Sequence, residues 1–286
     1  MIKRKIILSQ ITRVPVLSSA VQEGMRLLRD PQVDMGNLAK VLQHDPGITA
    51  NILRLANTPY FGSMSRVNNL RDAVVRLGAK RVSQLLLTVA VTPRISGELE
   101  GYDQAPCTLL EQSLAIAVAS ELTAAELGID APSHTFTAGL LANIGKIVLS
   151  QFLDNEYEQV NALVERENVS FEEAERRVLG ADHAEIGAEL LASWNLPEEI
   201  VRVVRHFRNP ESCAERDVAL DLVHIGSAAA AMTGIGQGLD GMQYPVSEAV
   251  VERLGLTEEQ VQEVMVKLLE HVAKLKEVLP KCEKEI

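Results

Sequence analysis

Apolar residues recur every three to four positions along most of this chain, and polar residues fill the positions between them. This period places the apolar side chains on one face of a helix, where they can pack against a core. Ile48, Ile52 and Leu55 show the pattern. We find no stretch with the strict apolar–polar alternation of a half-buried strand, and no internal repeat. The pattern therefore predicts an all-α fold.

Capping residues indicate where these helices begin and end. Asp34 precedes the segment MGNLAKVLQ, and Asp45 stands before Pro46, which suits the first position of a helix. Asn57, which tolerates a left-handed conformation, should end that second helix ahead of Pro59. Further helices are predicted at residues 70–77, closed by Gly78, at 79–91, closed by Pro93, at 107–128, 134–153 and 155–167, from the capping box of Ser170 and Glu173 to Gly180, at 183–194, 197–207 and 217–233, and from the capping box of Thr257 and Gln260 to about Leu279.

Prolines, glycines and charged residues are concentrated at residues 93–106, in the segment PRISGELEGYDQAP, which is typical of a boundary between lobes. We therefore predict a two-lobed helical bundle. An N-terminal helical lobe at residues 1–95 would be joined by a linker at 96–105 to a second helical lobe at 106–235. A helical extension at 236–286 would complete the chain.

The last predicted helix carries an apolar stripe with a period near 3.5 residues. Such a stripe can form a coiled-coil seam between two copies, or it can lie on the core of its own molecule. Both alternatives stay open, and the first makes a homodimer through the C-terminal helix a candidate assembly. The stripe consists of Val261, Met265, Leu268, Val272, Leu275 and Leu279.

The composition favours a helical, cytoplasmic protein. Hydrophobic residues make up 47% of the chain and aromatic residues only 3%, so the core must be built mainly from aliphatic side chains. We see no apolar run of the roughly 18 residues that a membrane span needs. Cys107, Cys213 and Cys282 lie far apart and suggest neither a disulfide framework nor a metal knuckle. We therefore expect reduced thiols and a cytoplasmic location.

Charge is unevenly distributed along the chain. The net charge of −11 argues against a general nucleic-acid binder. Residues 1–100 hold 14 Lys and Arg against 7 Asp and Glu, whereas residues 101–286 hold 14 against 32. This asymmetry is consistent with attraction between the lobes or to a partner, and also with an anion site on the first lobe.

Several motifs resemble one known family. The segments VDMGNLAKVLQHDPGITANILRLANTPYFG and NNLRDAVVRLGAKRVSQLLL are similar to the N-terminal lobe of the HDOD proteins, a bacterial group related to HD-domain phosphohydrolases. GLLANIGK and GADHAEIGAELLASWNLPEEIVRVVRHF resemble its HD-like lobe. The resemblance covers roughly residues 10–235. It implies an all-helical fold of two associated lobes and a regulatory role in bacterial signal transduction, usually without demonstrated enzymatic activity.

The resemblance also shows where a metal site would lie. HD phosphohydrolases hold a divalent cation with a His, a His-Asp pair and a later Asp, and the cation activates water for attack on phosphate. These positions match Ser113, the pair Ala142 and Asn143, and Ser227. None of the four side chains is a carboxylate or an imidazole. We therefore expect no enzymatic activity, no cofactor and no catalytic residue.

Two histidines match further ligand positions of some HD subgroups. His183 lies in GADHAEIG, and His206 occupies the place of a His-His pair whose second member is Phe207 here. Two imidazoles could hold a metal weakly, although catalytic sites usually have three protein ligands. The alternative is that both are structural residues bonded to their neighbours.

The leading functional hypothesis is a non-catalytic bacterial signalling module that acts through contacts with protein partners. Tyr60, Phe61 and Met64, in the loop YFGSM, are candidate interface residues, or they fill the core. A degenerate metal-dependent phosphohydrolase with a weak site at His183 and His206 is one alternative. A sensor that binds a nucleotide or another anion is the other.

Overall fold

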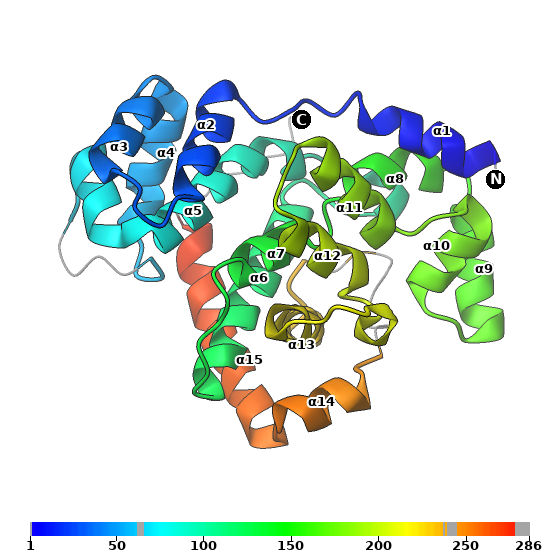
Figure 1. Ribbon diagram of the computed structural model, residues 1–286. Helices are drawn as coiled ribbons and strands as arrows, with labels where there is room; N and C mark the ends of the chain where they lie inside the picture. Colours follow the sequence, from blue (N-terminus) through cyan, green and yellow to red (C-terminus); the bar gives the residue numbers. More distant parts are fainter. Residues whose placement is uncertain (1, 62–65, 237, 239–244, 278–286) are drawn as a thin grey trace. The chain divides into compact units, whose positions relative to one another are not determined.

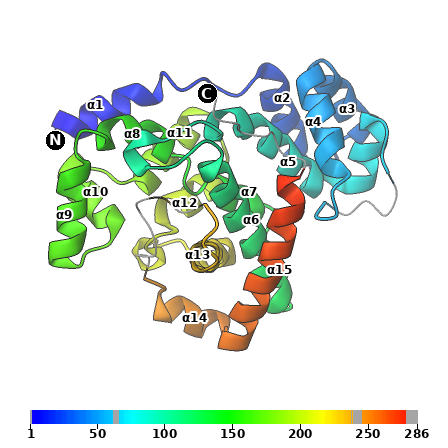
Figure 2. The same ribbon diagram turned by 180° about the vertical axis from the view of Figure 1, so that it is seen from behind.

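The computed structural model describes residues 2–61, 66–236, 238 and 245–277 (Figures 1 and 2). Throughout these residues the secondary structure is helical, and apart from an isolated bridge between Leu99 and Gln104 there is no β-structure. This confirms the predicted all-α class.

The chain divides into two compact units, and both are discontinuous in sequence. Unit 1 contains Met1–Pro15 and Ile95–Leu269. Unit 2 contains Val16–Arg94 and the described part of Glu270–Lys281. The division differs from the predicted one, because unit 1 includes the first fifteen residues, the predicted linker and most of the predicted extension.

Unit 2 is built from α2 (Ser19–Leu28), α3 (Met35–Gln43), α4 (Pro46–Ala56) and most of α5 (Leu70–Ile95). Asp34 and Asp45 cap α3 and α4 as predicted, by accepting hydrogen bonds from the backbone N–H groups of Gly36 and Ile48. Gly78 has φ +72° and separates two helical stretches within α5.

In unit 2, α4 ends at Asn57 as predicted, but the predicted conformation of Asn57 and the predicted place of Pro93 need correction. Asn57 is not left-handed; its φ is −89°, and its side chain instead bonds the backbone of Leu53 and Val67. At the end of α4 the Asn57 side chain donates to the Leu53 carbonyl oxygen, one of the last carbonyl groups of the helix, which lack an intrahelical partner. Pro93 lies inside α5 rather than after it. Proline has no backbone N–H and therefore cannot donate a hydrogen bond within the helix. Because α5 ends two residues later, at Ile95, the helix tolerates this loss.

Unit 1 holds the remaining elements. These are α1 (Ile2–Ile11), η1 (Glu100–Tyr102), α6 (Thr108–Glu126), α7 (Thr135–Leu141), α8 (Lys146–Leu153), α9 (Tyr157–Glu167), α10 (Phe171–Leu179), α11 (His183–Ser193), α12 (Glu198–His206), η2 (Pro210–Ser212), α13 (Val218–Met232), α14 (Glu248–Leu254) and the first part of α15 (Glu258–Lys276). The predicted capping box of Thr257 and Gln260 forms, with the two residues bonding each other. At the other, the Ser170 hydroxyl accepts from the Glu173 N–H, but the Glu173 carboxylate pairs with Arg176 and Arg177 instead of completing the box.

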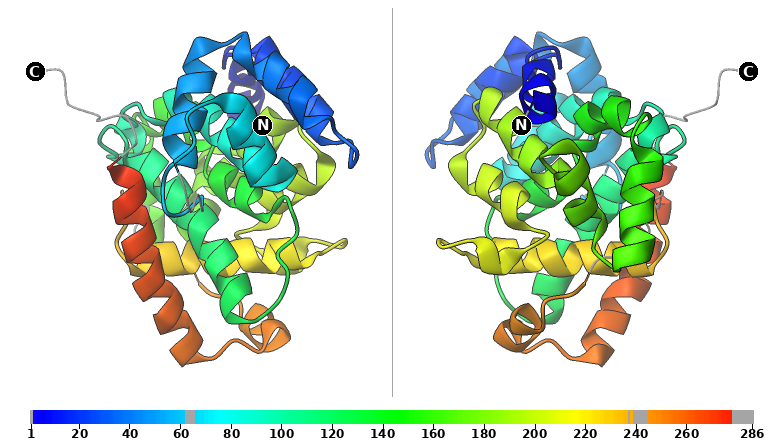
Figure 3. Two further views of the ribbon diagram at one scale, coloured as in Figure 1. Left: turned by 90° about the vertical axis from the view of Figure 1, so that its left-hand side faces the viewer. Right: turned by 90° about the vertical axis from the view of Figure 1, so that its right-hand side faces the viewer.

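The core of unit 1 lies where α6, α7 and α13 pack together, and Figure 3 shows α13 crossing α6. Glycines permit this close approach. A Cβ at Gly139 would lie 2.9 Å from the Ala117 Cα, and one at Gly226 would lie 2.3 Å from the Ser120 Oγ. Both helices can therefore approach α6 more closely than side chains would allow.

The predicted helix at 134–153 is interrupted, forming α7 and α8. This stretch, Thr135–Leu153, is long and apolar enough to cross a membrane by length and composition, so the expectation that no such run exists is wrong. However, 83% of its apolar window is buried inside the protein. We therefore assign it to the core of unit 1.

The apolar stripe of α15 is largely covered by the protein itself. Leu268, Val272 and Leu275 are buried, and Leu279 lies outside the described residues. Of the cysteines, Cys213 is a buried free thiol, whereas Cys107 is disulfide-bonded, which corrects the expectation of reduced thiols at that position. Cys282 lies outside the described residues.

Candidate functional site

The four residues at the matched metal positions are all buried in unit 1. Ser113 lies on α6, Ala142 and Asn143 lie in the break between α7 and α8, and Ser227 lies on α13. Among the described residues, the Ser113 Oγ and the Asn143 Nδ2 have no hydrogen-bond partner. Unlike most buried polar groups, these donors are unsatisfied.

Gly145 brings the α7–α8 break against the start of α11. A Cβ at this position would lie 2.0 Å from the His183 carbonyl oxygen and 2.5 Å from the Gly187 nitrogen. Only a glycine permits so close an approach of two backbone segments. The glycine of GLLANIGK next to its last residue thus holds the α7–α8 break against α11.

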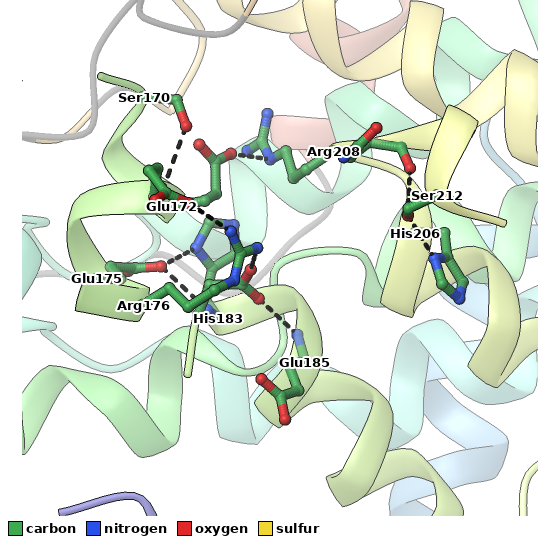
Figure 4. A network of polar contacts seen from close by, with 12 residues as sticks. Ser170, Glu172, Glu175, Arg176, His183, Glu185, His206, Arg208 and Ser212 are labelled. Carbon is green, nitrogen blue, oxygen red and sulfur yellow. Dashed lines mark hydrogen bonds and ion pairs between the residues drawn. The ribbon is translucent and has the colours of Figure 1, made fainter. Parts of the chain in front are cut away.

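Arg208 lies among these positions, two residues beyond the end of α12. Its Nη1 donates to the Ser227 Oγ at 3.0 Å, and its Nη2 donates to the Asn143 Oδ1 at 3.3 Å. Its Nε forms an ion pair with the Glu172 Oε1 at 2.8 Å (Figure 4). A guanidinium group therefore contacts two of the four residues that match metal ligands.

Glu172 lies in the first turn of α10, next to the Ser170 cap. Its side chain is only 5% exposed and that of Arg208 only 10%. Burial raises the pKa of Glu172, while the positive charge of Arg208 and the nearby His183 oppose this shift. A buried carboxylate in this position depends on its counterion.

His183 begins α11 and is fully buried. Its Nδ1 lies 2.8 Å from the Glu175 Oε2, which also accepts the His183 backbone N–H at 3.0 Å. The Tyr102 hydroxyl donates to the other oxygen of Glu175 at 2.5 Å. The His183 Nε2 has no hydrogen-bond partner among the described residues. Glu175 thus fixes the ring orientation, with Nδ1 as the protonated nitrogen.

His206 belongs to a different cluster. Its Nδ1 lies 2.8 Å from the Ser212 Oγ in η2. Burial lowers the pKa of His206, and the charges of Arg205 and Arg202 lower it further. Figure 4 shows His183 and His206 apart from each other, His183 beside Glu175 and His206 beside Ser212. The structure therefore does not bring the two predicted metal candidates together.

This arrangement does not fit a divalent cation. Such an ion requires several anionic or imidazole donors around one point. Here the matched positions supply neutral groups, and the Asn143 oxygen already accepts from a guanidinium. Within the described ranges, no group of three or more His, Cys, Asp or Glu residues could hold a metal ion.

A cavity of about 310 Å³ in unit 1 has Arg208 in its wall. Its charged residues are balanced by short ion pairs, including Glu172 with Arg208 and Glu173 with Arg176. The lining is otherwise rich in hydroxyl and amide groups. It consists of Ser170, Glu172, Glu173, Arg176, Arg208, Asn209, Pro210, Glu211, His224, Ser227, Ala228, Pro245, Val246 and Ser247.

The sequence prediction missed Arg208, Glu172, Glu175 and Tyr102 as parts of this site. Arg208 directly follows the pair His206 and Phe207, which the resemblance matches to a ligand motif, so its position was a signal that could have been used. Tyr102 carried no such signal, because it lies in a segment predicted to be a linker. Only the folded chain places its hydroxyl against α10.

The candidate interface residues lie in unit 2. Phe61 is 2% exposed and belongs to the core. The partly exposed Tyr60 packs edge-to-face on Phe61 and on His271, with the Arg81 guanidinium 5.3 Å from its ring centre. Met64 lies outside the described residues. Of the three, the structure thus presents Tyr60 as a partly accessible side chain.

Known proteins are similar to this chain in sequence or in fold. A protein from Treponema pallidum (strain Nichols) is 25% identical over 204 residues, which is 71% of this chain and 39% of the relative. The chain thus spans about two fifths of that protein's length.

Three solved structures also match. A Geobacter sulfurreducens HDOD domain protein of unknown function has a TM-score of 0.73 and 23% identity, with 98% of each chain covered. A Shewanella amazonensis SB2B protein provisionally named a phosphohydrolase has a TM-score of 0.65 and 25% identity, with 92% of this chain and 97% of that chain covered. A protein from Marinobacter aquaeolei VT8, provisionally named for signal transduction, has a TM-score of 0.67 and 25% identity, with 93% of this chain and 59% of that chain covered.

The HDOD domain model matches residues 14–210, which is more than half of the chain and includes the motifs that suggested the resemblance. The HDOD domain protein from Geobacter sulfurreducens matches the fold of this chain over 98% of each chain. This protein belongs to the HDOD domain family.

Proposed function

We propose that this chain is a non-catalytic regulatory module of bacterial signal transduction, which acts in the cytoplasm through contacts with protein partners. The observation that carries the proposal is the position of Arg208, whose guanidinium contacts Asn143 and Ser227 at two of the matched metal positions. A buried positive charge there repels a divalent cation. The helices of the HD-like fold are kept while the residues that would perform hydrolysis are not.

Family membership supports the regulatory half of the proposal. Its structural relatives carry provisional names for phosphohydrolase activity and for signal transduction. The alternative of a degenerate phosphohydrolase requires His183 and His206 to share a metal, and their separate partners argue against it. A role in signal transduction therefore fits the side chains at the matched positions better than metal-dependent hydrolysis does.

Hydrolysis assays test the non-catalytic half. Purified protein is incubated with a phosphodiester substrate and Mn²⁺, Mg²⁺ or Ni²⁺ in turn. We expect no turnover above that of the His183→Ala variant, with His206→Ala as a second reference. Metal-dependent turnover by the wild type that His183→Ala abolishes would contradict the proposal.

Affinity purification from the native cell, with identification by mass spectrometry, tests the partner half. Tyr60→Ala is the comparison variant, because Tyr60 is partly exposed whereas its neighbour Phe61 is buried. We expect a specific protein partner whose recovery Tyr60→Ala reduces. Equal recovery by wild type and variant would show that Tyr60 is not part of the interface. Recovery of no specific protein would contradict the proposal that the chain acts through protein partners.

A ligand-binding sensor is the second candidate, and the 310 Å³ cavity favours it. Ligand sites are usually concave and carry a few well-placed polar groups. The paired charges of the wall suit a small polar or singly charged ligand better than a polyphosphate. Thermal-shift measurements with mononucleotides and inorganic phosphate test this candidate. A saturable rise in the melting temperature that Ser227→Ala reduces would support it.

A further inference from the structure

The guanidinium of Arg208 is held by oxygens from three separate parts of unit 1. Glu172 contributes a carboxylate from α10, Ser227 a hydroxyl from α13, and Asn143 an amide carbonyl from the α7–α8 break. Each of these oxygens lies near a different nitrogen of the planar group: Glu172 near Nε (Figure 4), Ser227 near Nη1 and Asn143 near Nη2. The two Nη atoms donate hydrogen bonds, whereas the contact between Nε and Glu172 is a short ion pair without hydrogen-bond geometry. A planar guanidinium, with donors on all three nitrogens, can serve several oxygens from one position.

The surroundings also favour a positive charge. The Phe207 ring centre lies 4.6 Å from the Arg208 guanidinium carbon, within the range of a cation–π contact. Little of the Arg208 side chain reaches solvent. A charge buried to this extent persists only where an opposite charge and hydrogen-bond acceptors compensate it.

We propose that the site formed by Asn143, Glu172 and Ser227 is a cation site and that Arg208 provides the cation from within the chain. Asn143 and Ser227 retain an oxygen where the resemblance predicts metal ligands, but neutral oxygens suit N–H donors rather than a bare divalent ion. The cation that this site suits is therefore a guanidinium group. It follows that a chain without this side chain accepts a free guanidinium ion in its place.

The test uses the full chain with Arg208→Ala and follows thermal unfolding in low millimolar guanidinium. Urea is the critical control, since it is planar and of similar size but neutral. We expect a saturable rise in the melting temperature of Arg208→Ala with guanidinium, but none with urea or with NaCl of equal ionic strength. The wild type should show no rise.

Arg205→Ala is the matched control variant. Arg205 lies on α12 and pairs with Glu189 at 3.0 Å, but both side chains are more than a third exposed, at 34% and 39%. Its removal leaves no enclosed site, so guanidinium should not raise the melting temperature of Arg205→Ala. Equal effects of guanidinium and urea on Arg208→Ala would overturn the proposal.

A second comparison covers the case in which Arg208→Ala does not fold. Arg208→Lys keeps the charge, and Arg208→Met replaces it with an apolar chain of similar length. We expect the melting temperature to fall from wild type to Arg208→Lys and again to Arg208→Met. The gap between the two variants should close when Glu172→Gln is added, because the carboxylate is then absent. An Arg208→Met variant as stable as Arg208→Lys would overturn the proposal, as would stoichiometric Mn²⁺ binding to the wild type that Asn143→Ala abolishes.

Discussion

Gly145 shows how one residue of a short motif can fix the packing of two backbone segments. Its backbone lies so close to the start of α11 that a Cβ would overlap the His183 carbonyl oxygen. His183 is in turn fixed by Glu175. The placement of His183 thus depends on the close approach at Gly145.

Gly145→Ala should therefore destabilise unit 1. We expect the free energy of unfolding to fall by about 1–3 kcal/mol or more, the usual effect of forcing atoms into a packed site. Gly97→Ala is the control, because a Cβ at Gly97 would meet nothing within 4 Å. Urea denaturation of the two variants measures the difference. Equal stability of both variants would show that the α7–α8 break can move away from α11.

His224 gives stability a dependence on pH. Its Nδ1 lies 2.8 Å from the Phe207 carbonyl oxygen, and its Nε2 accepts the Ser247 N–H at 2.9 Å. Burial lowers its pKa below the usual 6.5, and Arg208 lowers it further against the opposing bond to Phe207. The folded chain therefore keeps this imidazole neutral. Its contribution to stability is fully present above the unfolded pKa and is lost as pH falls through the folded pKa, since the unfolded chain takes up the proton first.

His224→Gln removes this titration while an amide can replace both hydrogen bonds. We expect the variant to be less stable than wild type near neutral pH, but to lose less stability between about pH 7 and pH 5. Urea denaturation across this pH range measures both effects. His206→Gln is the comparison, because the pKa of His206 is also lowered but its site is more open. A His224→Gln curve parallel to that of wild type would contradict the argument.

At the scale of elements, η1 acts as a fixed part of unit 1 rather than as a linker. η1 packs against α8, where a Cβ at Gly101 would lie 2.1 Å from the Ser150 carbonyl oxygen. Tyr102 is fully buried, and its hydroxyl donates to Glu175 on α10. The Lys146 ammonium lies 5.0 Å from the centre of the Tyr102 ring. The segment therefore connects α8 and α10.

Tyr102→Phe should reveal the strength of this connection. Removal of the hydroxyl leaves one buried carboxylate oxygen of Glu175 without its donor, which typically costs about 1–3 kcal/mol. We expect a loss of this size in urea denaturation. The control is Tyr157→Phe, at the partly exposed first residue of α9, with an expected change within about 0.5 kcal/mol. A Tyr102→Phe variant as stable as this control would place the hydroxyl outside the network.

At the scale of the whole molecule, both units are assembled from segments distant in sequence. The N-terminal helix α1 packs on α8 and α11 of unit 1, although the chain then enters unit 2 before it returns. Lys3 pairs with Glu156 at 2.6 Å, and Arg4 forms an ion pair with Glu185. These pairs are partly exposed and contribute little by themselves. The buried apolar residues of α1 should therefore dominate its attachment.

Ile7→Ala and Ile6→Ala form a matched pair that tests this assembly. Ile7 is fully buried, whereas Ile6 is 48% exposed. We expect Ile7→Ala to lower the free energy of unfolding by about 2–5 kcal/mol, the range for large-to-small core substitutions. Ile6→Ala should change it by about 0.5 kcal/mol or less. Similar small effects of both would show that α1 is not part of the core of unit 1.

The sequence by itself determined the features that depend on neighbouring residues or on residue identity. The caps at Asp45, Ser170 and Thr257 were predictable, because a capping side chain bonds a backbone group only a few residues away. The chemical identity of Ser113 and Ala142 was also sufficient to show that neither of these two matched positions carries a carboxylate or an imidazole. Helix class and family followed from the same local information.

Only the tertiary structure decided which distant residues meet. The contact of Arg208 with Asn143 joins positions 65 residues apart, and the bond from Tyr102 to Glu175 spans 73. The membership of α1 in unit 1 and the close approach at Gly145 are likewise products of long-range packing. No local period or cap encodes such contacts, because they arise when helices far apart in sequence bury their apolar faces together.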